Sequence, residues 1–285
     1  MVFKPADKCA VVKAITSVKN KSQKSARDIK PSITINFHPD RLTYHGQPLL
    51  LALAKDGYLK SQFETQTSNG GLTAYKGGDR WRWEQEIFGG AYDEQANHLR
   101  PKYGALNFKQ YEFGAAPRFG SAFFQLKPHV FERATFCYPD SFFEPKDFAV
   151  GDRLQTLVTL AESGEHDLLD DYIEAHVHGA LSIKEDIECV VMDPIYHGGQ
   201  VHEQASRLGI PVEWHQGFEL SIQEMERFPD YRGQEFITLA KAIAVQGKIN
   251  PKLLDAALAS GNYDAQDIKK IWHYLARFGY PVPKG

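Results

Sequence analysis

Five short runs of apolar residues limit the folds open to this chain more than any other feature of its sequence. They cover residues 33–38, 121–126, 134–138, 172–178 and 187–192, and each has the length and the flanking residues of a strand. Helical patterns occupy 49–54 and 154–161, and after about residue 220 the pattern is helical throughout. Strands followed by a block of helices predict an α+β fold with a C-terminal helical subdomain.

The pattern divides the chain into three parts. Residues 1–30 carry repeated Lys, Ser and Asp with few large apolar side chains, which predicts a mobile leader with a short helix at 10–18. Residues 31–220 contain all the strand-like runs and form the predicted main domain. Residues 221–285 form the predicted helical subdomain, in which Asn250 and Asp264 are expected N-caps and Gly261 and Gly279 are expected helix ends.

Charge and cysteine content exclude several classes of protein. The formal net charge of −3 gives no general attraction to nucleic acid or anionic lipid. No apolar run approaches the roughly 20 residues that span a bilayer, and no signal-peptide core follows the first residue, so we expect a soluble protein. Cys9, Cys137 and Cys189 form no disulfide framework, and Cys189 lies in an apolar run where a small buried side chain is expected.

The segment 172–178 carries the most informative polar face in the sequence. Strand alternation sends its three apolar side chains into the core. The opposite face then consists of Tyr172, Glu174, His176 and His178. Such a face is either solvated or functional, and two histidines beside an aromatic ring are unusual on a merely solvated strand.

A second polar face lies on the run 33–38 and includes His38, with Asp40 and Arg41 just beyond it. The donors of Arg41 suit a nucleotide phosphate as well as a surface carboxylate. Gly120 and Ser121 stand at the entrance of the run 121–126, where a glycine permits close approach of a ligand or simply begins a strand. Each of these signals is weak by itself.

Residues 65–117 are dense in Gly, Asn and aromatic residues, and long structured loops of this kind are uncommon except where they build binding sites. Their aromatic side chains either fill the core or stack on a planar ligand. The chain contains no GxGxxG, P-loop, HExxH or GxSxG motif, which removes the commonest nucleotide, metalloprotease and hydrolase assignments. NAD is not excluded, because it is also bound by folds without a Rossmann unit.

The runs at 36–41, 63–71, 79–84, 88–92, 100–107, 117–121 and 136–140 together resemble one bacterial family. That family was long known only as a domain of unknown function. It includes the CteC-like effectors, which ADP-ribosylate a threonine of host ubiquitin. The likeness covers roughly residues 31–280, and several rare runs recur in order.

The resemblance implies an ADP-ribosyltransferase fold over 31–220, in which a split antiparallel β-sandwich grips NAD between two small sheets. It implies a catalytic Glu at Glu174, a middle-strand serine at Ser121, and a first-strand residue at His38 or Arg41. His176 or Asp40 is the implied base. The implied NAD-binding residues are Arg118, Gly120, Asn107, Tyr103, Arg80 and Asn69.

The same resemblance implies a metal-free bacterial effector that acts as a monomer in the host cytoplasm after secretion. Its acceptor would be a threonine of ubiquitin, so that modification blocks ubiquitination. Arginine-modifying relatives place a second Glu two residues before the catalytic one, whereas Tyr172 stands there in this chain. That departure argues against arginine as the acceptor.

Two other classes of function stay open at this point. Glu174, His176 and His178, with His197 or His202, would form a metal site if alternate strand residues converge on one ion. The Gly-rich aromatic loops would instead form a non-enzymatic protein-binding surface. The helical subdomain either holds the acceptor protein through polar positions such as Lys269 and Arg277 or only supports the sheets, as the apolar stripe at 268–275 suggests.

Overall fold

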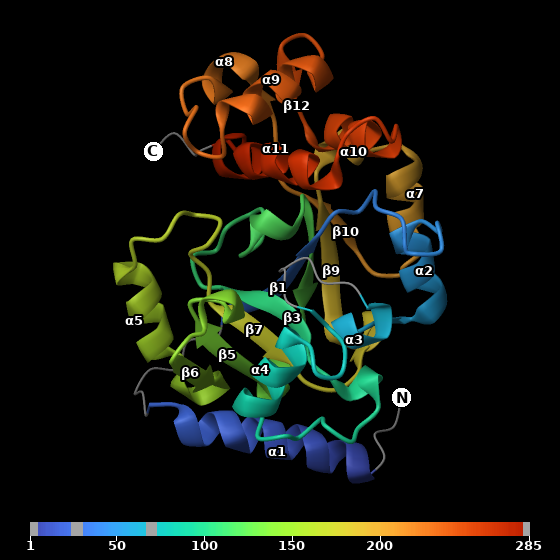
Figure 1. The fold of residues 1–285 in the computed structure, drawn as a ribbon. Coiled ribbons are helices and arrows are strands. Elements are labelled where there is room, and N and C mark those ends of the chain that lie inside the picture. The colour runs from blue at the N-terminus through green and yellow to red at the C-terminus, as the bar shows by residue number, and fades with distance from the viewer. Residues whose placement is uncertain (1–4, 24–30, 67–72, 282–285) are drawn as a thin grey trace.

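The computed structural model describes residues 5–23, 31–66 and 73–281. Its centre is an eight-stranded sheet with the order β10-β9-β4-β1-β3-β7-β5-β6 (Figure 1). Neighbouring strands are antiparallel except for β9 and β10. The strands are β1 (Ser32–Phe37), β3 (Lys102–Asn107), β4 (Ala122–Leu126), β5 (Ala134–Tyr138), β6 (Asp147–Val150), β7 (Glu174–Val177), β9 (Ile187–Met192) and β10 (Val212–Trp214). All five predicted strands are confirmed, whereas β3, β6 and β10 were not predicted.

Strand β3 joins two halves of this sheet. Its residues 105–107 pair with β1, but its residues 102–105 pair with β7 on the other side. Residues 35–37 of β1 pair only with β4, so β1 and β3 separate beyond the pair Thr34–Ala105. The resemblance implies two separate sheets, whereas the strand pairing gives one, because β3 links the two halves. An opening lies inside this sheet where β1 and β3 separate.

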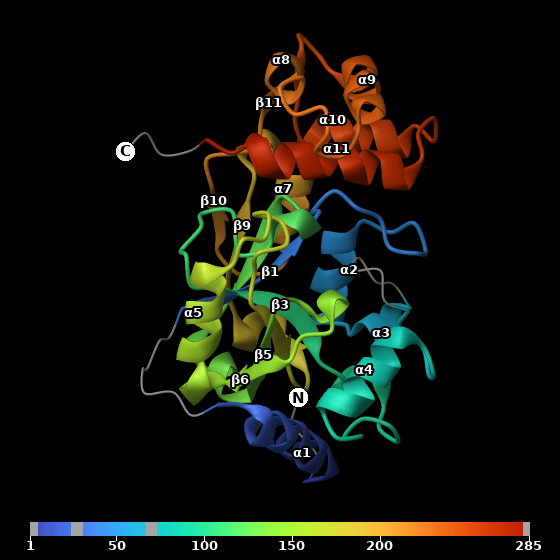
Figure 2. The ribbon, with the colours of Figure 1, turned by 60° about the vertical axis from the view of Figure 1, so that its left-hand side comes forward.

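Helices cover both faces of the sheet. Figure 2 shows α5 (Gln155–Ser163) on one side and α4 (Asp79–Ile87) on the other. The apolar residues of α5 join the main core with Ala175 and Val177 of β7. Next to the sheet lie α2 (Leu49–Asp56), α3 (Gln62–Thr65), α6 (Ile183–Asp186) and α7 (Gln200–Ser206), together with the short pair β2 (Tyr58–Leu59) and β8 (Leu181–Ser182). No described helix is long and apolar enough to cross a membrane.

The predicted mobile leader is wrong for most of its length. Residues Pro5–Lys21 form α1, a 17-residue helix that contains the short helix expected at 10–18. Ala10, Ala14 and Val18 repeat every four residues and are buried against Phe88 and strand β6. Small side chains at this spacing let the helix approach the sheet closely. The stripe contains none of the large apolar residues that usually indicate a packed helix in a sequence.

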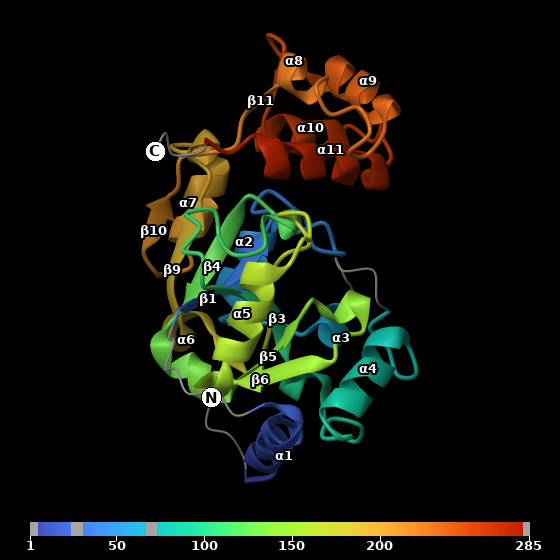
Figure 3. The ribbon, with the colours of Figure 1, turned by 90° about the vertical axis from the view of Figure 1, so that its left-hand side faces the viewer.

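The C-terminal helices gather at the opposite end of the molecule from α1 (Figure 3). They are α8 (Ile222–Met225), α9 (Gln234–Ile243), α10 (Pro251–Ala259) and α11 (Ala265–Phe278), with the short pair β11 (Leu220–Ser221) and β12 (Lys248–Ile249). The predicted N-caps are confirmed, because the side chains of Asn250 and Asp264 accept hydrogen bonds from the first turns of α10 and α11.

Helix α11 docks this subdomain onto the sheet. The indole N–H of Trp272 lies 3.1 Å from the carbonyl oxygens of both Pro117 and Arg118. Arg277 donates to Asp167 at 2.8 Å, so this position contributes to docking rather than to a free polar face. The subdomain core also includes Phe113 and Leu169 from the main domain, which makes the two parts share one packed interior.

Candidate functional site

A cleft of about 240 Å³ lies where β1 and β3 separate, and we call it the β1–β3 cleft. The parts of β1 and β3 that do not pair with each other line it, and β7, α4 and the segment after β5 close its other sides. Its aromatic lining is Phe37, Tyr103, Phe119, Phe142 and Tyr172. Its charged lining is Lys60, Arg80, Lys102, Asp140 and Glu174. Apolar walls with a few convergent polar groups are typical of ligand sites.

A larger hollow of about 670 Å³ lies elsewhere, against Asn107, Trp214 and His215. Both carboxylates on its wall, Glu112 and Glu213, are exposed to solvent. Its size alone therefore does not make it the better site, because the buried charges that chemistry needs gather in the β1–β3 cleft.

Glu174 is the first residue of β7, and its side chain is 7 % exposed. One carboxylate oxygen accepts from His176 Nε2 at 3.0 Å, and the other accepts from Ser141 Oγ at 3.0 Å. Burial by itself would raise the pKa of Glu174, but the His176 hydrogen bond and the charge of Arg80 outweigh burial and lower it. The cleft thus holds a buried carboxylate that stays ionised.

Arg80 reaches Glu174 from α4, with 3.9 Å between Nη1 and Oε1. Its guanidinium lies 4.1 Å from the centre of the Tyr103 ring, and Nη1 donates to Ser141 Oγ at 2.6 Å. The Nε of this buried side chain has no hydrogen-bond partner among the described residues. A fixed cation therefore stands beside the Glu174 carboxylate at the cleft wall.

Asp140 is a second buried carboxyl group on the cleft wall, and sequence reasoning missed it. It accepts from the Tyr172 hydroxyl and from the backbone N–H of Phe142. Burial and the negative charge of Glu174 raise the pKa of Asp140, although the Tyr172 hydrogen bond opposes this. Two carboxyl groups with pKa values pushed apart are suited to different roles, one as a charge and one as an acid or base.

His176 of β7 and His178 just after it lie behind Glu174 and do not line the cleft. Both side chains are fully buried, and Trp83 of α4 and Phe88 just after that helix cover them. The alternation predicted for 172–178 is confirmed, but its polar face packs against other polar groups rather than against solvent. The two nitrogens of His176 face Glu174 and Thr135, and His176 does not line the cleft, so this geometry does not favour the predicted role of His176 as base.

Three predicted residues near β4 have structural partners outside the cleft. Ser121 is fully buried, and its carbonyl accepts from His215 Nε2 at 2.7 Å. A Cβ on Gly120 would lie 2.0 Å from the carbonyl carbon of Phe37, so this glycine is needed for packing on β1. Asn107 closes a local turn with Tyr111 and lines the larger hollow.

The residues just after β1 are also not part of the cleft wall. His38 packs edge-on against Trp272 at 4.8 Å, and burial lowers its pKa to about 3. Arg41 pairs with Asp255 at 4.0 Å, and Asp40 accepts from the Tyr196 hydroxyl with a pKa that burial raises to about 6.

Of the predicted NAD-binding residues, Arg80 and Tyr103 line the cleft, whereas Arg118 does not and pairs with Asp170. Asn69 lies outside the described residues.

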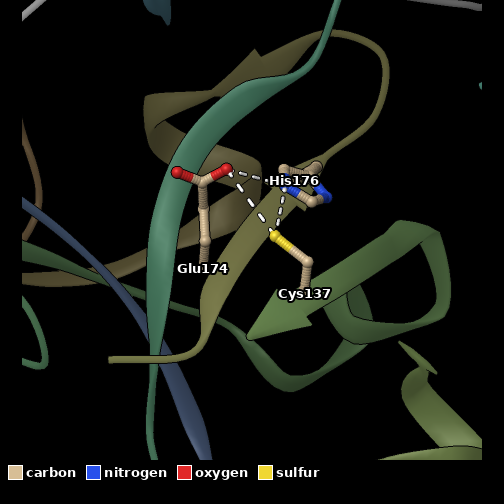
Figure 4. Close-up of side chains that lie close together, drawn as sticks. All are labelled: Cys137, Glu174 and His176. Carbon is tan, nitrogen blue, oxygen red and sulfur yellow. Dashed lines mark hydrogen bonds and ion pairs between the residues drawn. The ribbon is translucent and has the colours of Figure 1, made fainter. Parts of the chain in front are cut away.

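The metal alternative takes a different form from the one predicted. Cys137, Glu174 and His176 offer ligand atoms within 4.8 Å of one another, as Figure 4 shows. His178 is not in this set, and His197 and His202 pack on Trp214 instead. Burial raises the pKa of the Cys137 thiol well above its usual range, and His176 already bonds to Glu174, so an ion would have to displace both a proton and a hydrogen bond.

A comparison with known protein families identifies the family of this chain. The model of a family described as a protein of unknown function, DUF3626, matches residues 32–167 and 150–278. The chain belongs to the DUF3626 family. The DUF3626 match includes every strand that forms the cleft and also the helices α8–α11, so cleft and helical subdomain belong to one family unit. No curated protein matches the chain.

The cleft of this DUF3626 protein combines an ionised carboxylate, a buried guanidinium, a second carboxyl group of raised pKa and several aromatic walls. A fixed carboxylate in a water-poor site stabilises positive charge that develops on a substrate. A carboxyl group of raised pKa beside it accepts a proton more readily than an ordinary one.

Proposed function

We propose that this DUF3626 protein is an NAD-dependent mono-ADP-ribosyltransferase that modifies a threonine hydroxyl of another protein. The observation that carries the proposal is the buried, ionised Glu174 at the β1–β3 cleft. The sequence resemblance to the CteC-like effectors supports ubiquitin as the acceptor. On the same ground we propose that the protein is secreted into a host cytoplasm and blocks ubiquitination there.

The reaction requires one bond to break and one to form. The bond between nicotinamide nitrogen and ribose C1′ breaks, and its electron pair leaves with nicotinamide, which becomes neutral. Glu174 stabilises the positive charge that develops at C1′, a contribution that is commonly worth a hundredfold or more in rate. The threonine oxygen then bonds to C1′, and its proton passes to Asp140, whose raised pKa suits that role.

The cleft fits the nicotinamide end of NAD better than the whole molecule. At about 240 Å³ it is smaller than the usual ligand site, which begins at roughly 300 Å³. Its aromatic walls suit a flat ring, and the Arg80 guanidinium on its wall suits a carbonyl or phosphate oxygen. The adenosine half is then expected along the open mouth beside Lys60 and Gln62.

Tyr172 supports a hydroxyl rather than an arginine as the acceptor. Arginine-modifying relatives have a second Glu at this position, whereas here the Tyr172 hydroxyl donates to Asp140. The second carboxyl group on the cleft wall is Asp140, which comes from the segment after β5. A threonine acceptor needs a base to remove its hydroxyl proton, and Asp140 supplies one. An arginine acceptor instead needs a carboxylate that binds its positive charge.

Incubation of the purified protein with labelled NAD and ubiquitin, followed by mass spectrometry, tests the proposal. We expect nicotinamide release and one ADP-ribose on a threonine of ubiquitin. Asp140→Asn is expected to lower the rate of transfer more than it lowers the affinity for NAD. Absence of both nicotinamide release and protein labelling with the wild-type protein would refute the activity, and labelling of another protein alone would refute only the choice of ubiquitin.

A further inference from the structure

Four polar side chains meet behind Glu174, from β5, from β7 and the residue just after it, and from the segment after α4. The register of β5 and β7 sets Thr135 opposite His176 and Cys137 opposite Glu174. The hydroxyl of Thr135 lies 3.0 Å from His176 Nδ1 and 2.9 Å from His178 Nε2. Tyr92 adds a contact of 2.8 Å between its hydroxyl and His178 Nδ1. We call the groups of Tyr92, His178, Thr135 and His176 the buried relay.

The hydrogens of the buried relay can be assigned from its last member. Glu174 is ionised and can only accept, so His176 Nε2 carries the hydrogen and His176 Nδ1 is an acceptor. Thr135 must then donate to His176, which leaves its oxygen to accept from His178 Nε2. His178 Nδ1 is left to accept from the Tyr92 hydroxyl. All four hydrogen bonds run in one direction, toward the carboxylate.

The surroundings hold the relay in this state. Tyr92, Thr135 and both histidines are at most 1 % exposed, so water does not compete for these hydrogen bonds. The Phe88 ring packs edge-on against both imidazoles, at 5.6 Å from His176 and 4.9 Å from His178. Burial lowers the pKa of both histidines, which favours the neutral rings that the assignment requires.

We propose that Tyr92, His178 and Thr135 are positioning residues that fix His176 as an Nε2–H donor and so hold the Glu174 carboxylate oriented toward the cleft. Oε1 of Glu174 accepts from His176 Nε2 and from the Cys137 thiol at 4.0 Å, whereas Oε2 accepts from Ser141 Oγ alone among the described residues and keeps a lone pair for a substrate. The link to catalysis rests on the proposed function, whereas the hydrogen assignment does not.

Thr135→Val and Thr135→Ser form a matched pair that tests the proposal. Valine keeps the shape of threonine and removes the hydroxyl that joins the two histidines, whereas serine keeps the hydroxyl. Nitrogen-15 NMR of the histidine rings reports the tautomer independently of activity. We expect Nε2–H on His176 and His178 in the wild type and in Thr135→Ser, and mixed tautomers in Thr135→Val.

Turnover provides the second measurement. Loss of an outer partner of a functional histidine commonly costs on the order of 10- to 100-fold, so we expect Thr135→Val to lower kcat by that factor with little change in KM. Thr135→Ser should restore most of it. Tyr92→Phe, which keeps the ring, serves as a second variant if Thr135→Val does not fold, and it should disturb the His178 tautomer first.

Two results would overturn the proposal. One is a folded Thr135→Val or Tyr92→Phe protein in which both histidines keep Nε2–H. The other is a Thr135→Val protein whose tautomers change while kcat and its pH profile stay those of the wild type. If the wild-type protein itself releases no nicotinamide, the proposed function fails, and the NMR measurement still decides the hydrogen assignment.

Discussion

Gly104→Ala tests whether the β1–β3 cleft exists as described. Gly104 lies on β3 at the point where β1 and β3 begin to separate. A Cβ placed there would lie 2.6 Å from the carbonyl oxygen of Thr34 and 2.9 Å from Cγ1 of Ile35. The carbonyl belongs to the backbone of the neighbouring strand, so it cannot move aside without shifting that strand.

Overpacking of this kind typically costs about 1–3 kcal/mol in the free energy of unfolding. At roughly 2–4 °C per kcal/mol, the melting temperature of Gly104→Ala should fall by about 2–12 °C. The shifted strand also changes the shape of the cleft, so nicotinamide release from NAD should slow by more than the loss of folded protein explains. Thermal and urea unfolding, with NAD turnover measured below the transition, give both quantities.

Gly199→Ala is the matched control. Gly199 has an ordinary backbone conformation with φ −98°, and a Cβ there would lie 3.4 Å from its nearest neighbour. The lower entropy of the unfolded alanine chain offsets the weaker N-cap, so a change within about 0.5 kcal/mol is expected. If Gly104→Ala is as stable and as active as Gly199→Ala, then β1 and β3 do not approach each other as described. That result would contradict the described geometry of the cleft.

The remaining predictions concern the subdomain, pH and metal. Trp272→Phe removes the indole N–H that contacts Pro117 and should lower unfolding stability by about 1–3 kcal/mol, which urea unfolding measures; an unchanged value would argue against docking through α11. Burial, aided by nearby Arg232, lowers the pKa of His273 to about 3. Below about pH 6.5 this histidine is therefore protonated in the unfolded chain but not in the folded one, so the free energy of unfolding decreases as pH falls. His273→Phe should make that fall shallower by up to ~1.4 kcal/mol per pH unit between about pH 6.5 and 3, whereas the same change at exposed His45 should not. Activity should persist in excess chelator, and stoichiometric zinc whose removal abolishes activity would favour a metal site instead.

The sequence alone predicted those parts of the fold that depend on neighbouring residues, such as the alternation of apolar and polar residues in a strand. The run 172–178 alternates because one face of β7 joins the main apolar core, and that face was assigned correctly. Asn250 and Asp264 cap their helices through contacts with the next three residues, which is why sequence alone finds them.

Helix α4 escaped prediction for a physical reason. Its buried residues are Arg80, Glu84 and Ile87, so its inward side is mostly polar and leaves no apolar stripe. That side is polar because it faces the polar side of β7, across from Glu174 and His176. Flanking glycines then made the segment read as part of a long loop.

Most of the site depends on contacts between segments far apart in the chain. Asp140 and Ser141 reach Glu174 only because β5 pairs with β7, and no local motif marks them. Ser121 and His38 were assigned by their order along the chain, and the structure places neither of them on the cleft wall. Sequence order can suggest which residue types a reaction needs, but strand pairing decides which of them meet.

The most direct test of the account compares nicotinamide release from NAD, in the presence of ubiquitin, by the wild-type protein and by Glu174→Gln. Glutamine keeps the size of the side chain and removes its charge, so circular dichroism and thermal unfolding should show that the fold is retained. The account predicts that release and ubiquitin labelling both fall on the order of a hundredfold or more, because the charge that stabilises the cation at C1′ is gone. A folded Glu174→Gln protein with near wild-type turnover would contradict it.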